Sequence, residues 1–143
     1  MANGKYDKYI VTELKPVSTN VGGRPDFKPD EIQFVIALSN AIVKGASYIE
    51  SAWIFPGNLK RGEADVGPHK HDFDEILAMF GSNTEDVHDL GGEMLLTLGG
   101  EEHIMNKSFI AFIPAGLEHG PMKWLSMKRP VFHFTAGNTT EYH

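Results

Sequence analysis

Apolar residues alternate with polar ones in short runs along most of this chain, and turn residues separate the runs. The clearest run is ASYIESAWIF at residues 46–55, which Pro56-Gly57 follows. Strict alternation is typical of a strand with two different faces, and a Pro-Gly pair is typical of a turn. We therefore predict a strand over residues 46–55 that ends at this turn.

Later runs in the chain follow the same rhythm. Between residues 74 and 137 they read DEILAMFG, GEMLLTLGG, EEHIMN, KSFIAFIP, KWLSM and RPVFHFTAG. Short, evenly spaced runs divided by Gly, Pro or Asn indicate an all-β barrel or sandwich. The 15 glycines agree with a turn-rich fold of this kind.

The first third of the chain is less regular. Residues 6–14, YDKYIVTEL, predict a short strand, and residues 16–31 hold three prolines and two glycines, which predicts a loop. Residues 32–43, IQFVIALSNAIV, form either one buried strand with a continuation or a short helix. We favour the strand, because the apolar spacing does not keep a helical period. Residues 82–92 predict an exposed loop.

Length and charge narrow the class of protein. A chain of 143 residues suits one domain, and we expect a turn-rich arm over residues 1–44 that packs on a β-barrel core over residues 45–143. The formal net charge is -6 and the pI is near 5.6. The 13 basic residues are scattered, which argues against a nucleic-acid partner, because phosphate backbones select clustered Lys and Arg.

The absence of cysteine excludes several chemistries. With 0 Cys the chain has no disulfide and no thiolate nucleophile, so any metal must be held by nitrogen and oxygen ligands. The N-terminus lacks the apolar segment of a signal peptide, and the apolar runs are too short to cross a bilayer. We expect a soluble, cytoplasmic protein without a membrane partner.

The stretch GPHKHDFDE, residues 67–75, concentrates metal-binding residue types. In a strand, residues two apart share a face, so His69, His71 and Glu75 point the same way. Phe73 has the same parity, which predicts a local bend that turns its ring aside. Two imidazoles and a carboxylate are ligands that divalent transition metals accept.

A second stretch, FIPAGLEHG at residues 112–120, offers a fourth ligand. An apolar strand ends at Ile113, Pro114 and Gly116 make a tight turn, and His119 follows at the start of the next strand. This geometry can direct the His119 imidazole back toward a neighbouring strand.

The two stretches together resemble the motifs of the cupin superfamily, through His69-x-His71-x3-Glu75 and Pro114-x-Gly116-x2-His119. The resemblance covers roughly residues 45 to 135. It implies a single-domain cupin jelly-roll β-barrel in which these three histidines and the glutamate bind one divalent metal. Manganese, iron, cobalt and nickel all suit the set, and zinc fits it less naturally as a catalytic metal, although it can be bound.

The resemblance implies an enzyme that acts on a small oxygenated, anionic substrate. A 2-hydroxy or 2-oxo acid, an enediol or a diketone would fill two open metal positions, and a positive centre stabilises developing negative charge. Dioxygenation, isomerisation, decarboxylation and lyase chemistry all stay open, since the fold hosts many activities. The alternative is a small-molecule-binding or sensory cupin without turnover.

Three further residues are candidates for acid-base chemistry. His133 shares a strand face with Val131 and Thr135, and it either acts beside the metal or is simply hydrogen-bonded in the core. Glu50 and Tyr48 share the other candidate face. They would serve as base or substrate anchor only if that face lines the cavity.

We expect the Glu50 face to lie outside and the opposite face of the strand to fill the core, because two aromatic rings and an isoleucine make the better core face. That face carries Ile49, Trp53 and Phe55. The apolar wall of the pocket is expected from Phe73, Leu77, Met79, Phe112 and Trp124.

A homodimer is expected by analogy with cupins. Their sheets have exposed edges that proteins usually cover, and the predicted N-terminal strand around Tyr9 to Leu14 could exchange onto a partner's sheet.

Overall fold

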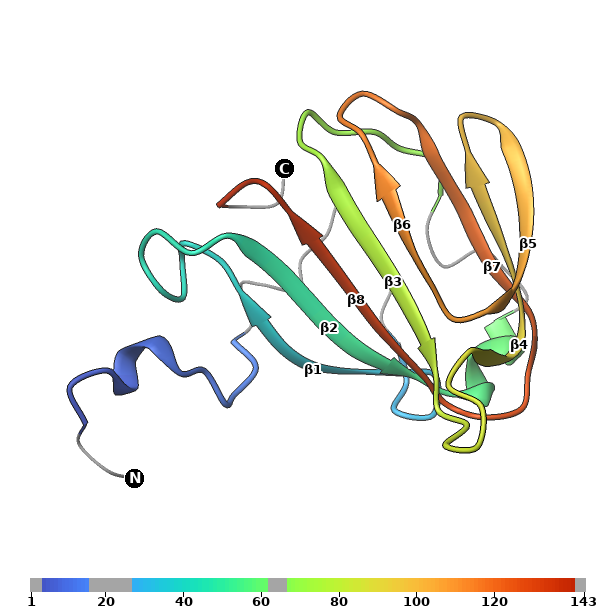
Figure 1. Cartoon of the computed structure of the whole chain (residues 1–143), viewed down its shortest axis with the longest axis horizontal. Helices are drawn as coiled ribbons and strands as arrows, with labels where there is room; N and C mark the ends of the chain where they lie inside the picture. Colours follow the sequence, from blue (N-terminus) through green and yellow to red (C-terminus); the bar gives the residue numbers. More distant parts are fainter. Residues whose placement is uncertain (1–3, 16–26, 62–66, 141–143) are drawn as a thin grey trace.

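A computed structural model of the chain describes residues 4–15, 27–61 and 67–140, and these residues form two packed antiparallel sheets (Figure 1). The larger sheet has five strands in the order β1-β2-β8-β3-β6, and the smaller has three in the order β5-β4-β7. In chain order the strands are β1 (Ile32–Leu38), β2 (Tyr48–Ile54), β3 (Glu75–Gly81), β4 (Asp89–Leu98), β5 (Glu101–Lys107), β6 (Phe109–Ile113), β7 (His119–Met127) and β8 (Val131–Gly137).

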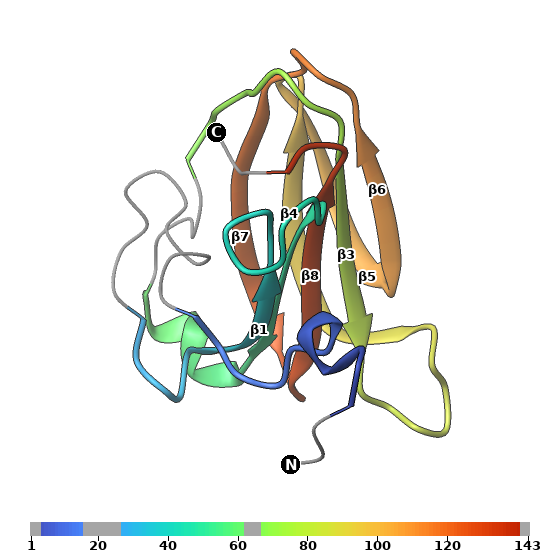
Figure 2. The same ribbon diagram turned by 90° about the vertical axis from the view of Figure 1, so that its left-hand side faces the viewer.

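The predicted all-β jelly roll is confirmed, with one correction to its closure. The strands of the two sheets enclose a shared apolar core. Figure 2 shows the same two sheets viewed from a direction 90° away from that of Figure 1. Among the described strands no ladder joins one sheet to the other, so the structure is a sandwich and not a closed barrel. The core contains Ile54, Leu77, Met79, Leu90, Met94, Leu96, Ile113, Met122, Trp124, Met127 and Val131.

The faces of β2 are opposite to those expected from the sequence. Tyr48 and Glu50 are 2% and 5% exposed, whereas Ile49 and Trp53 are 36% and 37% exposed on the outer face. The expectation was wrong because the outer face of the larger sheet is also apolar. There Trp53 packs edge-to-face on Phe132 of β8, with ring centroids 5.1 Å apart, so apolar character does not identify the inner face.

The strand expected over residues 6–14 is also wrong. Asp7–Tyr9 form a short 3-10 helix, η1, and residues 10–15 belong to no strand. The Asp7 carboxylate accepts a hydrogen bond from the Gly4 N–H at 2.6 Å. Such local side-chain bonds compete with sheet pairing, and they favour a turn here. The strand that was expected to exchange onto a partner is therefore absent from the described chain.

The remaining elements agree with the sequence in type and differ at their ends. The segment expected over residues 32–43 begins as a strand and not a helix, but that strand, β1, ends at Leu38. β4 begins at Asp89, inside the loop expected over residues 82–92. A second 3-10 helix, η3 (Pro56–Arg61), follows β2 at the predicted turn. The expected loop at residues 16–31 lies mostly outside the described residues. In the described part of the chain no helix is long and apolar enough to span a membrane.

Candidate metal centre

The first histidine pair lies in an irregular segment just before a strand. His69 forms an isolated antiparallel bridge, residues 72 and 73 form a bend, and β3 begins only at Glu75. The bend that Phe73 required is therefore present. It lets two imidazoles and a strand-borne carboxylate face the same point.

His119 is brought to this segment by backbone pairing. The His69 N–H donates to the His119 carbonyl and the His119 N–H donates to the His69 carbonyl, each at 2.9 Å. Gly120 follows with φ +96, and a Cβ placed there would lie 2.6 Å from the Gly67 carbonyl oxygen. A glycine is therefore required beside His119 for the two segments to approach so closely.

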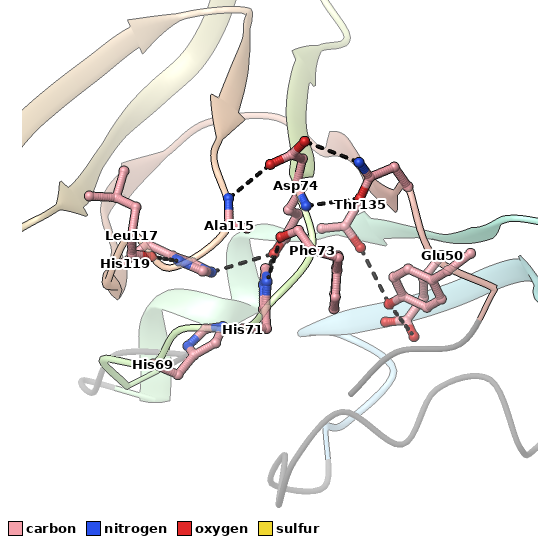
Figure 3. Close-up of polar contacts among 12 residues, drawn as sticks. Glu50, His69, His71, Phe73, Asp74, Ala115, Leu117, His119 and Thr135 are labelled. Carbon is pink, nitrogen blue, oxygen red and sulfur yellow. Dashed lines mark hydrogen bonds and ion pairs between the residues drawn. The ribbon is translucent and has the colours of Figure 1, made fainter.

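All four predicted ligands converge, and Figure 3 labels the three histidines among them. His69, His71, Glu75 and His119 each offer one ligand atom, and these atoms lie within 4.8 Å of one another. Glu75 Oε1 is 2.5 Å from His71 Nε2 and 3.4 Å from His119 Nε2. The side chains of Glu75, His71 and His119 are almost fully buried.

The three imidazoles share one hydrogen-bonding arrangement. In each, Nδ1 lies close to a backbone carbonyl two residues away: His69 to Gly67 at 2.9 Å, His71 to Phe73 at 3.1 Å and His119 to Leu117 at 3.0 Å. A carbonyl only accepts hydrogen bonds, so each Nδ1 is the protonated donor. This fixes the tautomer and turns all three Nε2 atoms toward the shared centre, as in histidines that bind metals.

The atoms at this centre fit a cation. His119 Nε2 is buried and lies 3.4 Å from Glu75 Oε1 without the geometry of a hydrogen bond, and a buried polar atom of this kind requires an explanation. His71 Nε2 lies 2.5 Å from Glu75 Oε1, and a contact this short requires a proton between the two atoms. A cation between these atoms would take the place of that proton and would give His119 Nε2 a partner.

The titration behaviour of the centre follows from the same contacts. Burial raises the pKa of the Glu75 carboxyl, but the interactions with the imidazoles of His119 and His71 outweigh burial and leave that pKa below its ordinary value. Burial lowers the pKa of His119, and the Glu75 carboxylate and the Leu117 carbonyl outweigh it, so the pKa of His119 is raised. In the metal-free centre the raised pKa of His119 favours a proton that a cation would displace.

Phe73 forms the apolar wall beside the centre. Its ring stacks on the His71 ring, with centroids 4.0 Å apart and an angle of 5° between the planes. A Cβ on Gly137 of β8 would lie 2.7 Å from this ring, so glycine leaves the space that the ring fills. Leu77, Met79 and Trp124 are buried as expected, but Phe112 is 61% exposed on the outer face and is not part of the wall.

A second polar group lies on the inner face, beyond Phe73 in Figure 3. The Tyr48 hydroxyl lies 3.3 Å from Glu50 Oε2 and 3.5 Å from the Thr135 hydroxyl. Strand pairing places Tyr48 opposite Gly137, and Gly137 opposite Glu75. Two strand spacings of about 4.8 Å each therefore place the Tyr48 backbone about 10 Å from the Glu75 backbone.

His133 is on the same inner face but is bound to the sheet. It pairs with Ala52 and Met79 on the two neighbouring strands, and its Nδ1–H donates to the Ala78 carbonyl at 2.9 Å. This is the core hydrogen bond that the sequence left as one of two possibilities. A catalytic role for His133 stays a prediction.

Sequence reasoning missed Asp74, which supports the centre. Asp74 lies between the ligands His71 and Glu75, and its carboxylate contacts Ala115 and Asn138. Its parity is opposite to that of the ligands, so the alternation pattern placed it away from the site. Only the spatial approach of residues 114–119 and 138 reveals its contacts.

Comparison with known proteins supports the fold. No protein-family model matches the chain, and no curated protein matches it in sequence. Among solved structures it is similar to a recombinant oxalate oxidase in complex with glycolate, with a TM-score of 0.54 and 16% identity over 96% of this chain and 62% of that one. It is also similar to Peruvianin-I, a cysteine peptidase from Thevetia peruviana latex, with a TM-score of 0.57 and 10% identity over 99% of this chain and 78% of that one.

A third similar structure is an RmlC-like cupin from Shewanella frigidimarina, with a TM-score of 0.44 and 12% identity over 74% of this chain and 73% of that one. The chain shares the fold of the oxalate oxidase and of Peruvianin-I, and its two packed antiparallel sheets form the jelly roll that its two motifs predict. The structural similarity establishes the fold, but at identities this low the activity must be argued from the residues of the site. The chain spans 62% of the length of the oxalate oxidase, and its lack of cysteine rules out the thiol of a cysteine peptidase.

Replacing Glu75 tests the electrostatics of the centre. In metal-free protein, Glu75→Gln should lower the pKa of His119, because the carboxylate that raises it is removed while the burial that lowers it stays. NMR titration of the histidine rings measures this. Glu93→Gln, on the exposed part of β4, is the charge-matched control and should leave the pKa of His119 as it is in the unmutated protein. An unchanged pKa of His119 in Glu75→Gln would contradict the geometry described.

Proposed function

We propose that His69, His71, Glu75 and His119 bind one divalent transition metal. The observation that supports this most strongly is the convergence of four ligand atoms within 4.8 Å, together with three imidazoles whose Nδ1 atoms are already bound to carbonyls. Nitrogen and carboxylate ligands of this kind suit manganese, iron, cobalt or nickel, and they also accept zinc.

We propose further that the protein is an enzyme for a small oxygenated anion. Four protein ligands on an ion that prefers six leave two positions, which suits a bidentate 2-hydroxy acid, 2-oxo acid, enediol or diketone. When bound, such an ion supplies positive charge that stabilises an enolate or carboxylate. Glycolate, which the structurally similar oxalate oxidase holds, is a 2-hydroxy acid of this class.

Phe73, Glu50 and Tyr48 are assigned roles beside the metal ligands. Phe73 is 4% exposed and keeps the side of the centre next to His71 apolar, which limits water there. Glu50 and Tyr48 form a buried carboxylate–phenol pair on the same inner face. We assign to Glu50 the transfer of a proton to or from the substrate, with Tyr48 holding the carboxylate in place. A carboxylate placed in this way can transfer a substrate proton in isomerisation or lyase chemistry.

Removal of single ligands tests metal binding. His71→Ala and His119→Ala should each weaken metal binding by more than the roughly 10–100-fold that loss of an outer-shell partner costs. Elemental analysis after dialysis and calorimetric titration with Mn²⁺ measure this. His103→Ala is the matched control, since His103 also pairs with a glutamate, Glu101 at 2.9 Å, but on a more exposed strand.

The unmutated protein and His103→Ala should retain about one metal per chain. Both should also melt at a higher temperature with metal, because a metal at 100 times its Kd raises the free energy of unfolding by about 2.7 kcal/mol. Full metal content in both His71→Ala and His119→Ala would contradict the assignment.

Turnover separates the enzyme from a binding protein. Protein loaded in turn with each metal should consume oxygen, exchange a substrate proton or release product with at least one of a panel of hydroxy acids, keto acids and diketones. Glu50→Gln should bind metal normally and lose most of the turnover, because general acid-base groups contribute about 10²–10⁴-fold. Ligand binding without turnover under every metal would favour the non-catalytic alternative.

A further inference from the structure

Asp74 joins three parts of the molecule around the metal centre. Its carboxylate accepts hydrogen bonds from the Ala115 N–H at 2.9 Å and from the Asn138 side-chain amide at 3.0 Å. Its own N–H donates to Asn138 Oδ1 at 2.9 Å, and its carbonyl accepts from the Asn138 N–H at 3.2 Å. Figure 3 shows the carboxylate between the Ala115 turn and the end of β8.

These bonds extend the backbone ladder between the two ligand segments. That ladder consists of the reciprocal pair between His69 and His119 and of the Gly116 N–H donating to the His71 carbonyl at 2.9 Å. The bond from Ala115 to Asp74 is the next contact along it. The ladder thus runs from one ligand segment to the other and ends at a residue directly before Glu75.

We propose that Asp74 is a positioning residue that sets the distance between the histidine pair and His119. The proposal rests on the proposed metal site. The segment from His69 to Asp74 is irregular and bent, so sheet pairing does not fix it as it fixes β3. The Asp74 carboxylate supplies the missing constraint. One of its oxygens binds the turn at Ala115, and the other binds Asn138, which directly follows β8. Outer partners of this kind typically change metal affinity about 10–100-fold.

An exchange of the two side chains tests this proposal. In Asp74→Asn the amide of residue 74 meets the Asn138 amide, donor against donor. In Asn138→Asp, two carboxylates meet, acceptor against acceptor. The double variant Asp74→Asn with Asn138→Asp restores a donor opposite an acceptor, keeps the carbonyl oxygen that accepts from Ala115, and keeps the net charge.

Affinity for Mn²⁺, measured by calorimetry, should weaken about tenfold or more in both single variants and return to within a few-fold in the double variant. If charge alone mattered, Asn138→Asp would raise the affinity for Mn²⁺, because it adds a negative charge near the centre. Glu118→Gln, which removes an exposed carboxylate beside His119, is the control and should bind almost normally. Tighter binding by Asn138→Asp, or no recovery in the double variant, would overturn the proposal.

A second readout does not depend on metal. Hydrogen exchange of the Gly116 and His119 amides in metal-free protein should quicken in both single variants and slow again in the double variant. If the unmutated protein binds no metal, the proposed function fails, and the exchange rates still decide whether Asp74 holds the two segments together. Unchanged rates in the single variants would show that it does not.

A separate observation concerns the outer face of the larger sheet. The outward positions of its five described strands carry no charged side chain, although the chain has 19 acidic and 13 basic residues. Aromatic rings pair across neighbouring strands there, Trp53 with Phe132 and Phe80 with Phe134. Side chains at least 36% exposed on this face are Val35, Ile49, Trp53, Ile76, Ile110 and Phe112.

The outer face of the smaller sheet differs in composition. Glu93 on β4, Lys123 on β7 and Glu102 on β5 lie at outward positions there. Five strands about 4.8 Å apart and about 20 Å long give the apolar face an area on the order of 500 Å² in projection. This is at the upper end of what monomers expose, and it is of the order that each partner of a stable complex buries.

We propose that a second copy of this chain covers the apolar face. A charged partner would find no complementary group on it, whereas two copies with a net charge of -6 each meet there without bringing like charges together. A two-fold interface needs one patch that complements itself, and a broad sheet of apolar side chains meets this condition.

Two isoleucines of similar exposure on opposite faces provide a matched test. Ile110→Glu on β6, 61% exposed, should convert the dimer to a monomer in sedimentation velocity across the micromolar range, while Ile104→Glu on β5, 56% exposed, should leave a dimer. Phe112→Glu replaces Ile110→Glu if circular dichroism shows that variant to be unfolded. An unmutated protein that sediments as a monomer, or equal dissociation by Ile104→Glu, would overturn the proposal.

Discussion

The pairing of His69 with His119 is the interaction on which the rest of the site depends. Two reciprocal backbone hydrogen bonds at 2.9 Å join residues fifty positions apart in the chain. They bring an irregular segment against the start of β7, and Gly120 makes that approach possible. Every other contact of the centre, from the stacking of Phe73 to the bonds of Asp74, lies next to this pair.

The chemistry follows from how the polar atoms around the pair are used. Each imidazole binds a carbonyl of its own segment through Nδ1. The Nε2 atoms therefore face the Glu75 carboxylate, and the four ligand atoms lie within 4.8 Å of one another. Without a cation, His119 Nε2 makes no well-formed hydrogen bond among the described residues and lies 3.4 Å from Glu75 Oε1. The same inner face carries Glu50 and Tyr48, and this places a possible proton donor and a possible metal in one enclosed layer.

The sequence predicted the site better than it predicted the sheet that carries it. His69, His71, Glu75 and His119 were found because their spacing reflects local geometry, which a short motif records. The inner face of β2 was misassigned because Trp53 and Ile49 lie on an apolar outer face, so hydrophobicity did not distinguish inside from outside. The N-terminal strand failed because a local bond of Asp7 favours a turn. Asp74 could not be found from sequence, since its contacts depend on how distant segments meet.

Anomalous diffraction from crystals grown with Mn²⁺ tests the central claim most directly. We expect one strong anomalous peak per chain, at coordination distance from the Nε2 atoms of His69, His71 and His119 and from a carboxylate oxygen of Glu75. A peak bound elsewhere, or density at this point that does not scatter anomalously while the four side chains keep the positions described, would contradict it.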